Sequence, residues 1–415
     1  ILVTGIVAVC GVLMSWRVEH RANEFFAYFL ALIGGVYGTF LSMDLFLLFV
    51  FYEIAIIPKY FIIAIWGSGR KSYAAMKLAL YSFGGSALVL FGILAIYFGS
   101  GLETFDLVRL MQEADFSEEF QVIFFACTFI GFAVLAGMWP FHTWAPTGHA
   151  AAPVAASMLL AGVVMKLGAY GCLRVAVGLL PEGAHHWASA IAWIAVINIC
   201  YGALVALRQR DFKFVIGYSS VSHMGFILLG FATLNLTGLT GTVLQMFSHG
   251  VIGALLFAIV GGMVYERTHT RELDELHLLV ERMPGIAWAF VLAGLASMGL
   301  PGFSGFISEL YILIGAWEQE SLSLWILVFA GFGILATFGY TLVKIHEAFF
   351  RKRAWRADNE DEKTDPYPPM TLPEKATFVI LIGCSVAVGL YPRLLTQWIE
   401  PALVPLVETL NAVVK

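Results

Sequence analysis

The stretch Met138-Trp139-Pro140-Phe141-His142-Thr143-Trp144-Ala145-Pro146 interrupts an apolar segment with two prolines. A second apolar segment is interrupted by Gly299-Leu300-Pro301-Gly302-Phe303-Ser304-Gly305. Proline removes a backbone donor and clashes with the preceding turn, and glycine frees the backbone, so both stretches predict a broken helix. Broken helices inside apolar segments are typical of ion paths. The alternative is two proline kinks whose freed backbone groups bind neighbouring helices.

The sequence around these breaks is too apolar for a water-soluble globule. Of its 415 residues, 60% are hydrophobic and only 13% are charged, against about 25% charged in soluble domains. A spanning helix needs ~20 apolar residues, and the sequence divides into twelve such stretches. We therefore predict an all-α polytopic membrane protein, with amphipathic pieces at 102–114 and 394–414 that lie along the membrane surface.

The positions of lysine and arginine support this division. Cytoplasmic loops of membrane proteins carry an excess of both residues. Of the 24 lysines and arginines, sixteen lie in loops on one side of the predicted membrane and four on the other. The remaining four lie inside predicted helices, and they are Lys59, Lys77, Lys166 and Lys344.

The two broken helices occupy matching positions, because each is fourth in a set of five predicted helices. A set of five reverses its own orientation, so we predict two inverted five-helix repeats with flanking transmembrane helices. The predicted divisions are 1–23, a truncated flanking helix and loop; 24–175, the first repeat; 176–350, the second repeat; 351–371, a charged cytoplasmic loop; and 372–415, the last transmembrane helix with a C-terminal amphipathic helix.

Two ionisable residues stand in the middle of apolar segments. A charge at the depth of Glu53 or Lys166 must be paired, neutralised or exposed to water. A buried group that gains or loses a proton when a neighbouring charge moves has the chemistry of a relay. The alternatives are a Glu53 carboxyl that joins helices by hydrogen bonds and a Lys166 side chain that extends to the interface near Arg174.

Three further charged residues lie closer to helix ends. Lys77 fits a relay and a surface anchor equally well, and we expect Lys344 to be an anchor. Glu309 follows the second break, where freed backbone groups and water could solvate it. Its alternative role is a charge that the helix dipole favours.

Two intramembrane histidines lie on polar helix faces. Ser219 and Ser222 share a face with His223, and Gln245 lies one turn before His249. Imidazole can pass a proton between its two nitrogens, so we predict that both histidines are steps in a hydrated path. Packing residues are the alternative.

Several classes of function are not supported. A net charge of −5 offers no basic surface for nucleic acid. The five cysteines lie in apolar segments without the spacing of zinc or iron–sulfur sites, and we expect them to be packing residues. No phosphate-binding or dinucleotide fingerprint is recognisable. We therefore predict no metal and no cofactor on this chain, so that any redox chemistry takes place on another chain.

Six motifs, in order along the chain, carry a resemblance to a known family. They are Phe51-Tyr52-Glu53 with Pro58; Pro140 to Pro146; Leu160-Ala161-Gly162 with Lys166 and Tyr170; Tyr218 to Gly225; Gln245-Met246 with His249-Gly250; and Pro301-Gly302 with Glu309. Together they resemble the antiporter-like, proton-translocating subunits of respiratory complex I (NADH-quinone oxidoreductase), closest to subunit M, the bacterial counterpart of mitochondrial subunit four. The resemblance covers essentially the whole chain and implies that two helices precede it.

The resemblance implies a role for each buried residue. Glu53 would be the key glutamate of the first half, Lys166 the central lysine, His223 and His249 the connecting histidines, and Glu309 the terminal acid. Sister subunits L and N carry lysine in that last position, so a glutamate there favours subunit M.

One position departs from the family pattern. The family carries a lysine seven residues before the histidine of the His-Thr-Trp motif, and here that residue is Leu135. Conversely, Lys59 stands where the family usually has an apolar residue. Either Lys59 supplies the missing charge, or the Glu53 half of the path works differently. Lys59 and Lys77 are therefore added to the predicted relay.

The resemblance further implies a non-redox, proton-pumping subunit of a complex I-type NADH:quinone oxidoreductase in a bacterial inner membrane. NADH, flavin and iron–sulfur clusters would lie on partner subunits. The expected partners are antiporter-like subunits L and N, small membrane subunits and the lipid bilayer. Two alternatives stay open: a homologous subunit of a multi-subunit sodium/proton antiporter or membrane-bound hydrogenase, and a non-pumping structural subunit.

Overall fold

The computed structural model describes residues 1–351 and 366–413, and within these ranges the chain is helical, with no strand longer than an isolated bridge. Ten helical spans in this part of the chain are long and apolar enough to cross a membrane, and two shorter apolar helices accompany them. The predicted all-α polytopic fold is confirmed. Most of the predicted charged loop at 351–371 lies outside the described residues.

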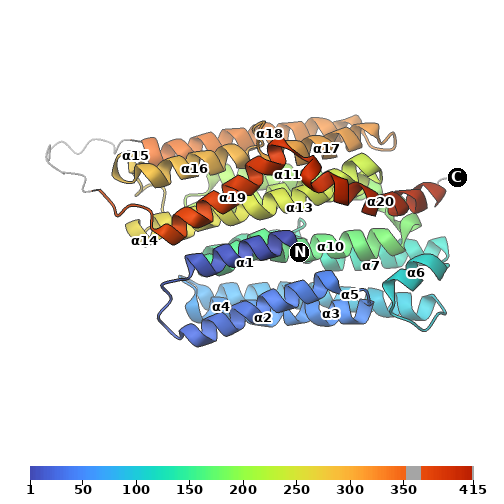
Figure 1. The fold of residues 1–415 in the computed structure, drawn as a ribbon. Coiled ribbons are helices and arrows are strands. Elements are labelled where there is room, and N and C mark those ends of the chain that lie inside the picture. The colour runs from blue at the N-terminus through green and yellow to red at the C-terminus, as the bar shows by residue number, and fades with distance from the viewer. Residues whose placement is uncertain (352–365, 414–415) are drawn as a thin grey trace.

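The first half of the chain forms one group of roughly parallel helices. In Figure 1, α2 to α5 form the lower layer, with α7 and α10 above them. The helices of this half are α1 (Leu2–Met14), α2 (Ala22–Leu41), α3 (Leu45–Ile54), α4 (Ile56–Trp66), α5 (Lys71–Gly99), α6 (Leu107–Glu113), α7 (Glu118–Ala136), the 3-10 turn η1 (Phe141–Thr143), α8 (Trp144–Ala151), α9 (Val154–Leu159), the π-helix η2 (Leu160–Val164), α10 (Met165–Gly171) and the π-helix η3 (Cys172–Val177).

The second half forms the upper part of the molecule, and α16, α17 and α18 lie along its edge (Figure 1). The helices α19 and α20 contact α13. The helices of this half are α11 (Pro181–Arg208), α12 (Phe212–Thr233), α13 (Leu236–Phe257), the π-helix η4 (Ala258–Val264), α14 (Tyr265–Thr268), α15 (Leu279–Arg282), α16 (Pro284–Ser297), α17 (Ser304–Glu318), α18 (Leu324–Ile345), the π-helix η5 (His346–Phe350), α19 (Leu372–Leu390) and α20 (Arg393–Val413).

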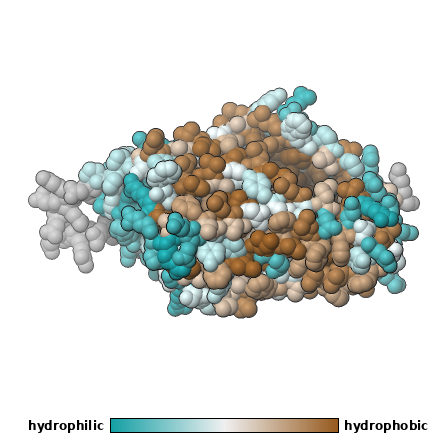
Figure 2. All heavy atoms as spheres, turned by 60° about the horizontal axis from the view of Figure 1, so that its bottom comes forward, coloured by the Kyte–Doolittle hydropathy of each residue, from teal (hydrophilic) through white to brown (hydrophobic). Residues whose placement is uncertain are grey.

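The surface has the polarity that a bilayer requires. Figure 2 shows hydrophobic side chains over the middle of one face and hydrophilic side chains gathered towards its two ends. Large apolar side chains such as Phe98 and Leu335 are exposed. In water these would be unfavourable, whereas in a membrane they face lipid.

Both predicted broken helices are present, and glycine explains each break. Helix α7 ends at Ala136, and Gly137 follows with φ +84°. Helix α16 ends before Gly299 (φ +71°) and Gly302 (φ +101°), and α17 then begins. Only glycine adopts this left-handed backbone at little cost, so the chain leaves the helix at these positions.

A side chain from the second half holds the first break in place. Asn198 of α11 is fully buried. Its Oδ1 accepts a hydrogen bond from the Trp139 backbone N–H at 2.6 Å, and its Nδ2 donates to the carbonyl oxygens of Val221 (2.8 Å) and Gly137 (3.3 Å). The unwound backbone therefore keeps its hydrogen bonds without water, as burial requires.

Helices α7 and α10 pack at backbone distance. A Cβ atom added at Gly168 of α10 would lie 2.4 Å from the Phe132 carbonyl oxygen of α7. Glycine at this position therefore fixes the distance between the broken helix α7 and the helix that carries Lys166.

We expect Gly168→Ala to destabilise the protein, because its methyl group would overlap the Phe132 carbonyl oxygen. Overpacking of this kind costs about 1–3 kcal/mol. The measurement is the melting temperature of the detergent-purified protein. Gly84→Ala is the matched control, since Gly84 of α5 has open space around it and alanine favours a helix by about 0.5–1 kcal/mol. Equal melting temperatures for the two variants would contradict the close packing.

Candidate functional site

Lys166 is buried between the two halves of the molecule. Its side chain is 2% exposed. Its Nζ donates a hydrogen bond to the Ala161 carbonyl oxygen and lies 2.8 Å from Nδ1 of His249 on α13. The alternative of a side chain that extends towards Arg174 at the interface is therefore wrong.

Three more predicted residues continue from Lys166. The rings of His249 and His223 stack with their centroids 5.6 Å apart. His223 Nδ1 lies 3.1 Å from Glu309 Oε1, and its Nε2 lies 3.3 Å from the Ser297 hydroxyl. Lys166, His249, His223 and Glu309 thus form one buried row, here called the central row, with members from α10, α13, α12 and α17.

Glu309 is held by hydrogen bonds rather than by a helix terminus. It is the sixth residue of α17, past the first turn, where the dipole has little effect. Gln245 Nε2 donates to its Oε1 at 3.3 Å, and Ser308 donates to the Gln245 side-chain oxygen. A Cβ at Gly299 would lie 3.1 Å from Glu309 Oε2. The glycine of the second break therefore leaves room for this carboxyl group.

Glu53 and Lys59 lie on either side of another helix interruption. Helix α3 ends at Ile54 and α4 begins at Ile56. Pro58 explains the interruption, because a proline cannot bond to the carbonyl four residues earlier and its ring clashes with it. Glu53 is half-buried and lies within electrostatic reach of Lys59, and its Oε1 has no hydrogen-bond partner among the described residues.

Lys59 points into the protein. Its side chain is 0% exposed, and its Nζ lies 6.0 Å from the ring centroid of Trp144 with no hydrogen-bond partner in the described part of the chain. The same indole donates to the Val134 carbonyl oxygen of α7 at 2.9 Å. The ammonium group of Lys59 therefore approaches the segment of α7 that carries Leu135.

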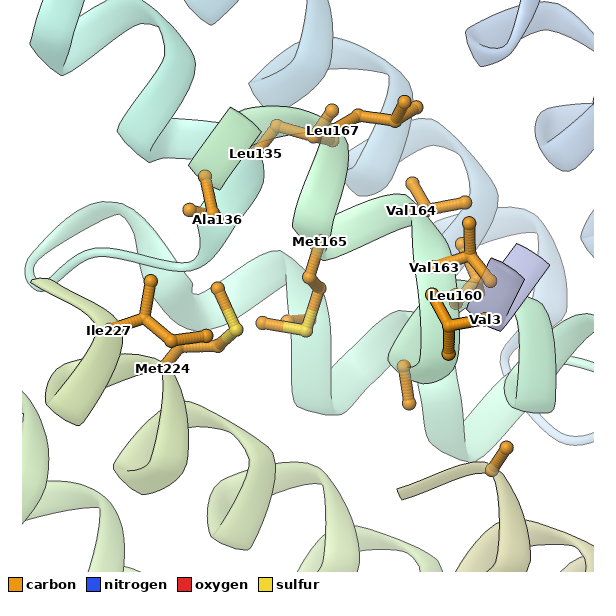
Figure 3. Packing of buried hydrophobic residues seen from close by; sticks show 14 of the residues in the cluster. Val3, Leu135, Ala136, Leu160, Val163, Val164, Met165, Leu167, Met224 and Ile227 are labelled. Atoms are coloured by element: carbon orange, nitrogen blue, oxygen red, sulfur yellow. The ribbon is translucent and has the colours of Figure 1, made fainter. Parts of the chain in front are cut away.

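Leu135 itself belongs to a buried apolar cluster. Figure 3 shows its side chain together with those of Met165 and Leu167, which lie on either side of Lys166 on α10. The family's lysine position is thus filled by a packed leucine, and the nearby positive charge comes from α4 instead.

The other two intrahelical lysines lie away from the central row. Lys77 is half-buried, with its Nζ 3.4 Å from the Thr147 hydroxyl of α8, so it faces the first broken helix. Lys344 is only 5% exposed. Its Nζ donates to the Gln209 carbonyl oxygen at 2.9 Å and to Glu347 at 2.8 Å. Lys344, which we expected to anchor its helix at the membrane surface, therefore binds groups of the protein itself.

Two buried groups escaped sequence reasoning. His149 is fully buried, stacks on Phe257 at 4.9 Å, and has no hydrogen bond at either ring nitrogen within the described residues. Lys213 is one of the sixteen residues that the sequence assigns to loops, and that assignment is wrong. It is 3% exposed on α12 and donates to the Ala152 carbonyl oxygen at 2.9 Å. Asp211 is the sequence signal that predicts a helical position for Lys213, because an aspartate N-cap starts the helix before it.

The fold and the site define a class of protein. A bundle with two broken helices and a buried row of ionisable side chains is the architecture of an ion-translocating membrane subunit. The chain belongs to the NADH:quinone oxidoreductase/Mrp antiporter transmembrane family, whose model matches residues 42–334.

Comparison with known proteins confirms the resemblance to complex I subunit M. NADH-quinone oxidoreductase subunit M of Rhodobacter capsulatus is 37% identical over 410 residues, which cover 96% of this chain and 78% of that protein. A chain of respiratory complex I from Thermus thermophilus with bound NADH superposes with a TM-score of 0.89 at 27% identity, over 100% of this chain and 84% of that one. A chain of the archaeal membrane-bound sulfane sulfur reductase gives 0.87 at 25% identity, over 98% and 81%.

Proposed function

We propose that this chain is a non-redox, proton-translocating membrane subunit of a complex I-type NADH:quinone oxidoreductase. The observation that carries the proposal is the central row, whose four ionisable residues are 2–6% exposed. Each such group inside a membrane costs several kcal/mol unless it is paired or serves a path. The central row satisfies both conditions, because Lys166 pairs with His249, His223 pairs with Glu309, and the stacked imidazole rings connect the two pairs across the halves of the bundle.

A proton moves along the central row by exchange between neighbouring groups. The ammonium group of Lys166 donates a proton to Nδ1 of His249 and becomes a neutral amine. Nε2 of His249 has no hydrogen-bond partner among the described residues, so it releases its proton to a water, which passes it to His223. Nδ1 of His223 then donates to the carboxylate of Glu309. A new proton on Lys166 restores the starting state. Histidine suits the middle positions because its two nitrogens accept and donate in turn.

The Glu53–Lys59 pair provides electrostatic control of this row. A positive charge that approaches Lys166 favours release of its proton, and a charge that withdraws favours uptake. Electron transfer on other subunits would move such charges. Transfer of one proton against the membrane potential requires about 2.3 kcal/mol per 100 mV.

We assign NADH, flavin and iron–sulfur clusters to partner subunits. Within the described residues, no group of three or more His, Cys, Asp or Glu side chains could hold a metal ion. The proposed partners are antiporter-like subunits L and N, small membrane subunits and the lipid bilayer. The proposed location is a bacterial inner membrane, with the lysine- and arginine-rich loops on the cytoplasmic side.

A subunit of a multi-subunit sodium/proton antiporter is the second candidate, because the family model also describes Mrp antiporters. Purification of the native complex distinguishes the two. Partner subunits that contain flavin and iron–sulfur clusters would support the oxidoreductase, and their replacement by further antiporter subunits would contradict it.

Lys166→Ala should leave the complex assembled and reduce proton pumping about tenfold or more, because alanine cannot carry a proton. Pumping is measured as acidification of inverted membrane vesicles during NADH oxidation. Lys375→Ala is the control, since Lys375 is an exposed lysine at the start of α19. Normal pumping by an assembled Lys166→Ala complex would end the relay role.

Glu309→Gln should impair pumping to a similar degree, whereas Glu309→Asp should keep part of it. The amide preserves a polar contact to His223 but cannot accept a proton, and the aspartate can. Glu318→Gln, an exposed change on the same helix, controls for unspecific effects. If Glu309→Gln pumps as wild type, the carboxyl group is structural.

Lys59→Met should lower pumping, because Glu53 then loses the positive charge in its neighbourhood. The double variant Lys59→Met, Leu135→Lys places a lysine on α7, at the position where the family carries one, and should regain part of the lost activity. Both are compared in the vesicle assay at equal complex content. Normal pumping by Lys59→Met would show that its charge is not used.

A further inference from the structure

Three cavities lie in series between the lysine- and arginine-rich face and His223. The first, here called the surface cavity, has a volume of about 310 Å³ and opens at the ends of α11 and α18. Charged side chains line it, and they include Arg208, Arg210, Asp274, Lys344 and Glu347. Bulk water can therefore enter it.

The second cavity, here called the middle cavity, begins at Lys344, which also lines the surface cavity. Its volume is about 20 Å³, enough for a single water molecule, which needs roughly 10–15 Å³. Hydroxyl groups of Ser219, Ser297, Tyr340 and Thr341 belong to its lining residues. The exposed wall of the middle cavity is almost entirely apolar, so a water there depends on these hydroxyl groups.

The third cavity, here called the inner cavity, begins at Ser297, which it shares with the middle cavity. Its volume is about 10 Å³, and its lining includes His223, His249 and Glu309 of the central row. Lys344 and Ser297 are thus the two connecting residues between the surface and the central row.

Hydrogen bonds follow the same course. Lys344 Nζ donates to Glu347 at 2.8 Å, and the Ser219 and Tyr340 hydroxyls lie 2.6 Å apart on the wall of the middle cavity. Ser297 Oγ then lies 3.3 Å from His223 Nε2. Thr341 Oγ1 is buried beside the Tyr340 hydroxyl, with which it interacts without forming a full hydrogen bond. A buried hydroxyl without a full hydrogen bond to the protein is the usual site of an ordered water.

We propose that these three cavities form a proton inlet that leads from the lysine- and arginine-rich face, past Lys344 and Ser297, to His223. This inference rests on the proposed function. The inlet supplies protons to the row at His223, while transfer along the row still requires Lys166. A proton from water in the surface cavity reaches the middle cavity when Lys344 turns aside. It then passes from that water to the Ser297 hydroxyl, which gives its own proton to His223, so that the water and the hydroxyl group return to their starting states.

The simpler explanation is that these polar groups only hold helices together. Lys344 does contact the Gln209 carbonyl oxygen at the end of α11, as a helix cap would. A cap, however, does not need a line of cavities behind it. The two explanations differ in whether water reaches Thr341.

Water access is tested directly with a thiol at Thr341. In a variant whose five native cysteines are replaced, Thr341→Cys should react with Ag⁺, an ion small enough to follow water, added to inverted vesicles. The reaction is measured as protection from a maleimide applied after denaturation. Leu342→Cys is the control, because the neighbouring side chain is 53% exposed on the apolar surface. The inlet would be overturned if Ag⁺ protected both variants from the maleimide equally, or if it did not protect Thr341→Cys at all.

Its use is tested by pumping. Thr341→Val and Ser297→Ala remove one hydroxyl each from the inlet and should lower pumping several-fold at unchanged complex content. Thr39→Val removes a buried hydroxyl that bonds within its own helix at 2.9 Å, and should have no effect. Normal pumping by Ser297→Ala, with Lys166→Ala inactive, would refute the inlet and leave the proposed function intact. Normal pumping by Lys166→Ala would refute the proposed function instead.

Discussion

The contact between Lys166 and His249 joins the two halves of the molecule. An amine buried at this depth needs a hydrogen-bond partner inside the protein, and the imidazole at 2.8 Å supplies it. Two glycines make the contact possible, since a Cβ at Gly162 or Gly250 would lie 3.0 or 2.7 Å from the other residue's carbonyl oxygen. The backbones of η2 and α13 therefore touch, and the central row lies beside this contact.

The two broken helices solve the same physical problem in different ways. At the first break, Asn198 from the other half of the molecule binds the unwound backbone. At the second break, the missing side chain of Gly299 leaves space for the carboxyl group of Glu309. One break therefore positions helices, whereas the other receives a functional group. This difference fits the unequal chemistry of the two halves, because three members of the central row come from the second half.

Lys59 illustrates how a small backbone change alters electrostatics. Six residues of a regular helix correspond to about 600° of rotation. In such a helix, Lys59 would therefore point in a different direction from Glu53. The interruption before Pro58 changes this relation, and Lys59 turns to the indole of Trp144. A lysine on α4 can thus approach the part of α7 that holds Leu135.

The sequence by itself determined the all-α membrane fold, both breaks and the ionisable members of the central row. Composition, proline and glycine act locally, and a charge in an apolar segment is conspicuous without any neighbour. Only the tertiary structure decided which of these charges meet. The direction of Lys59, the burial of Lys213 and Lys344, the unpartnered His149 and the cavities behind Ser297 depend on contacts between helices far apart in sequence. Such contacts follow from packing geometry, which no single segment encodes.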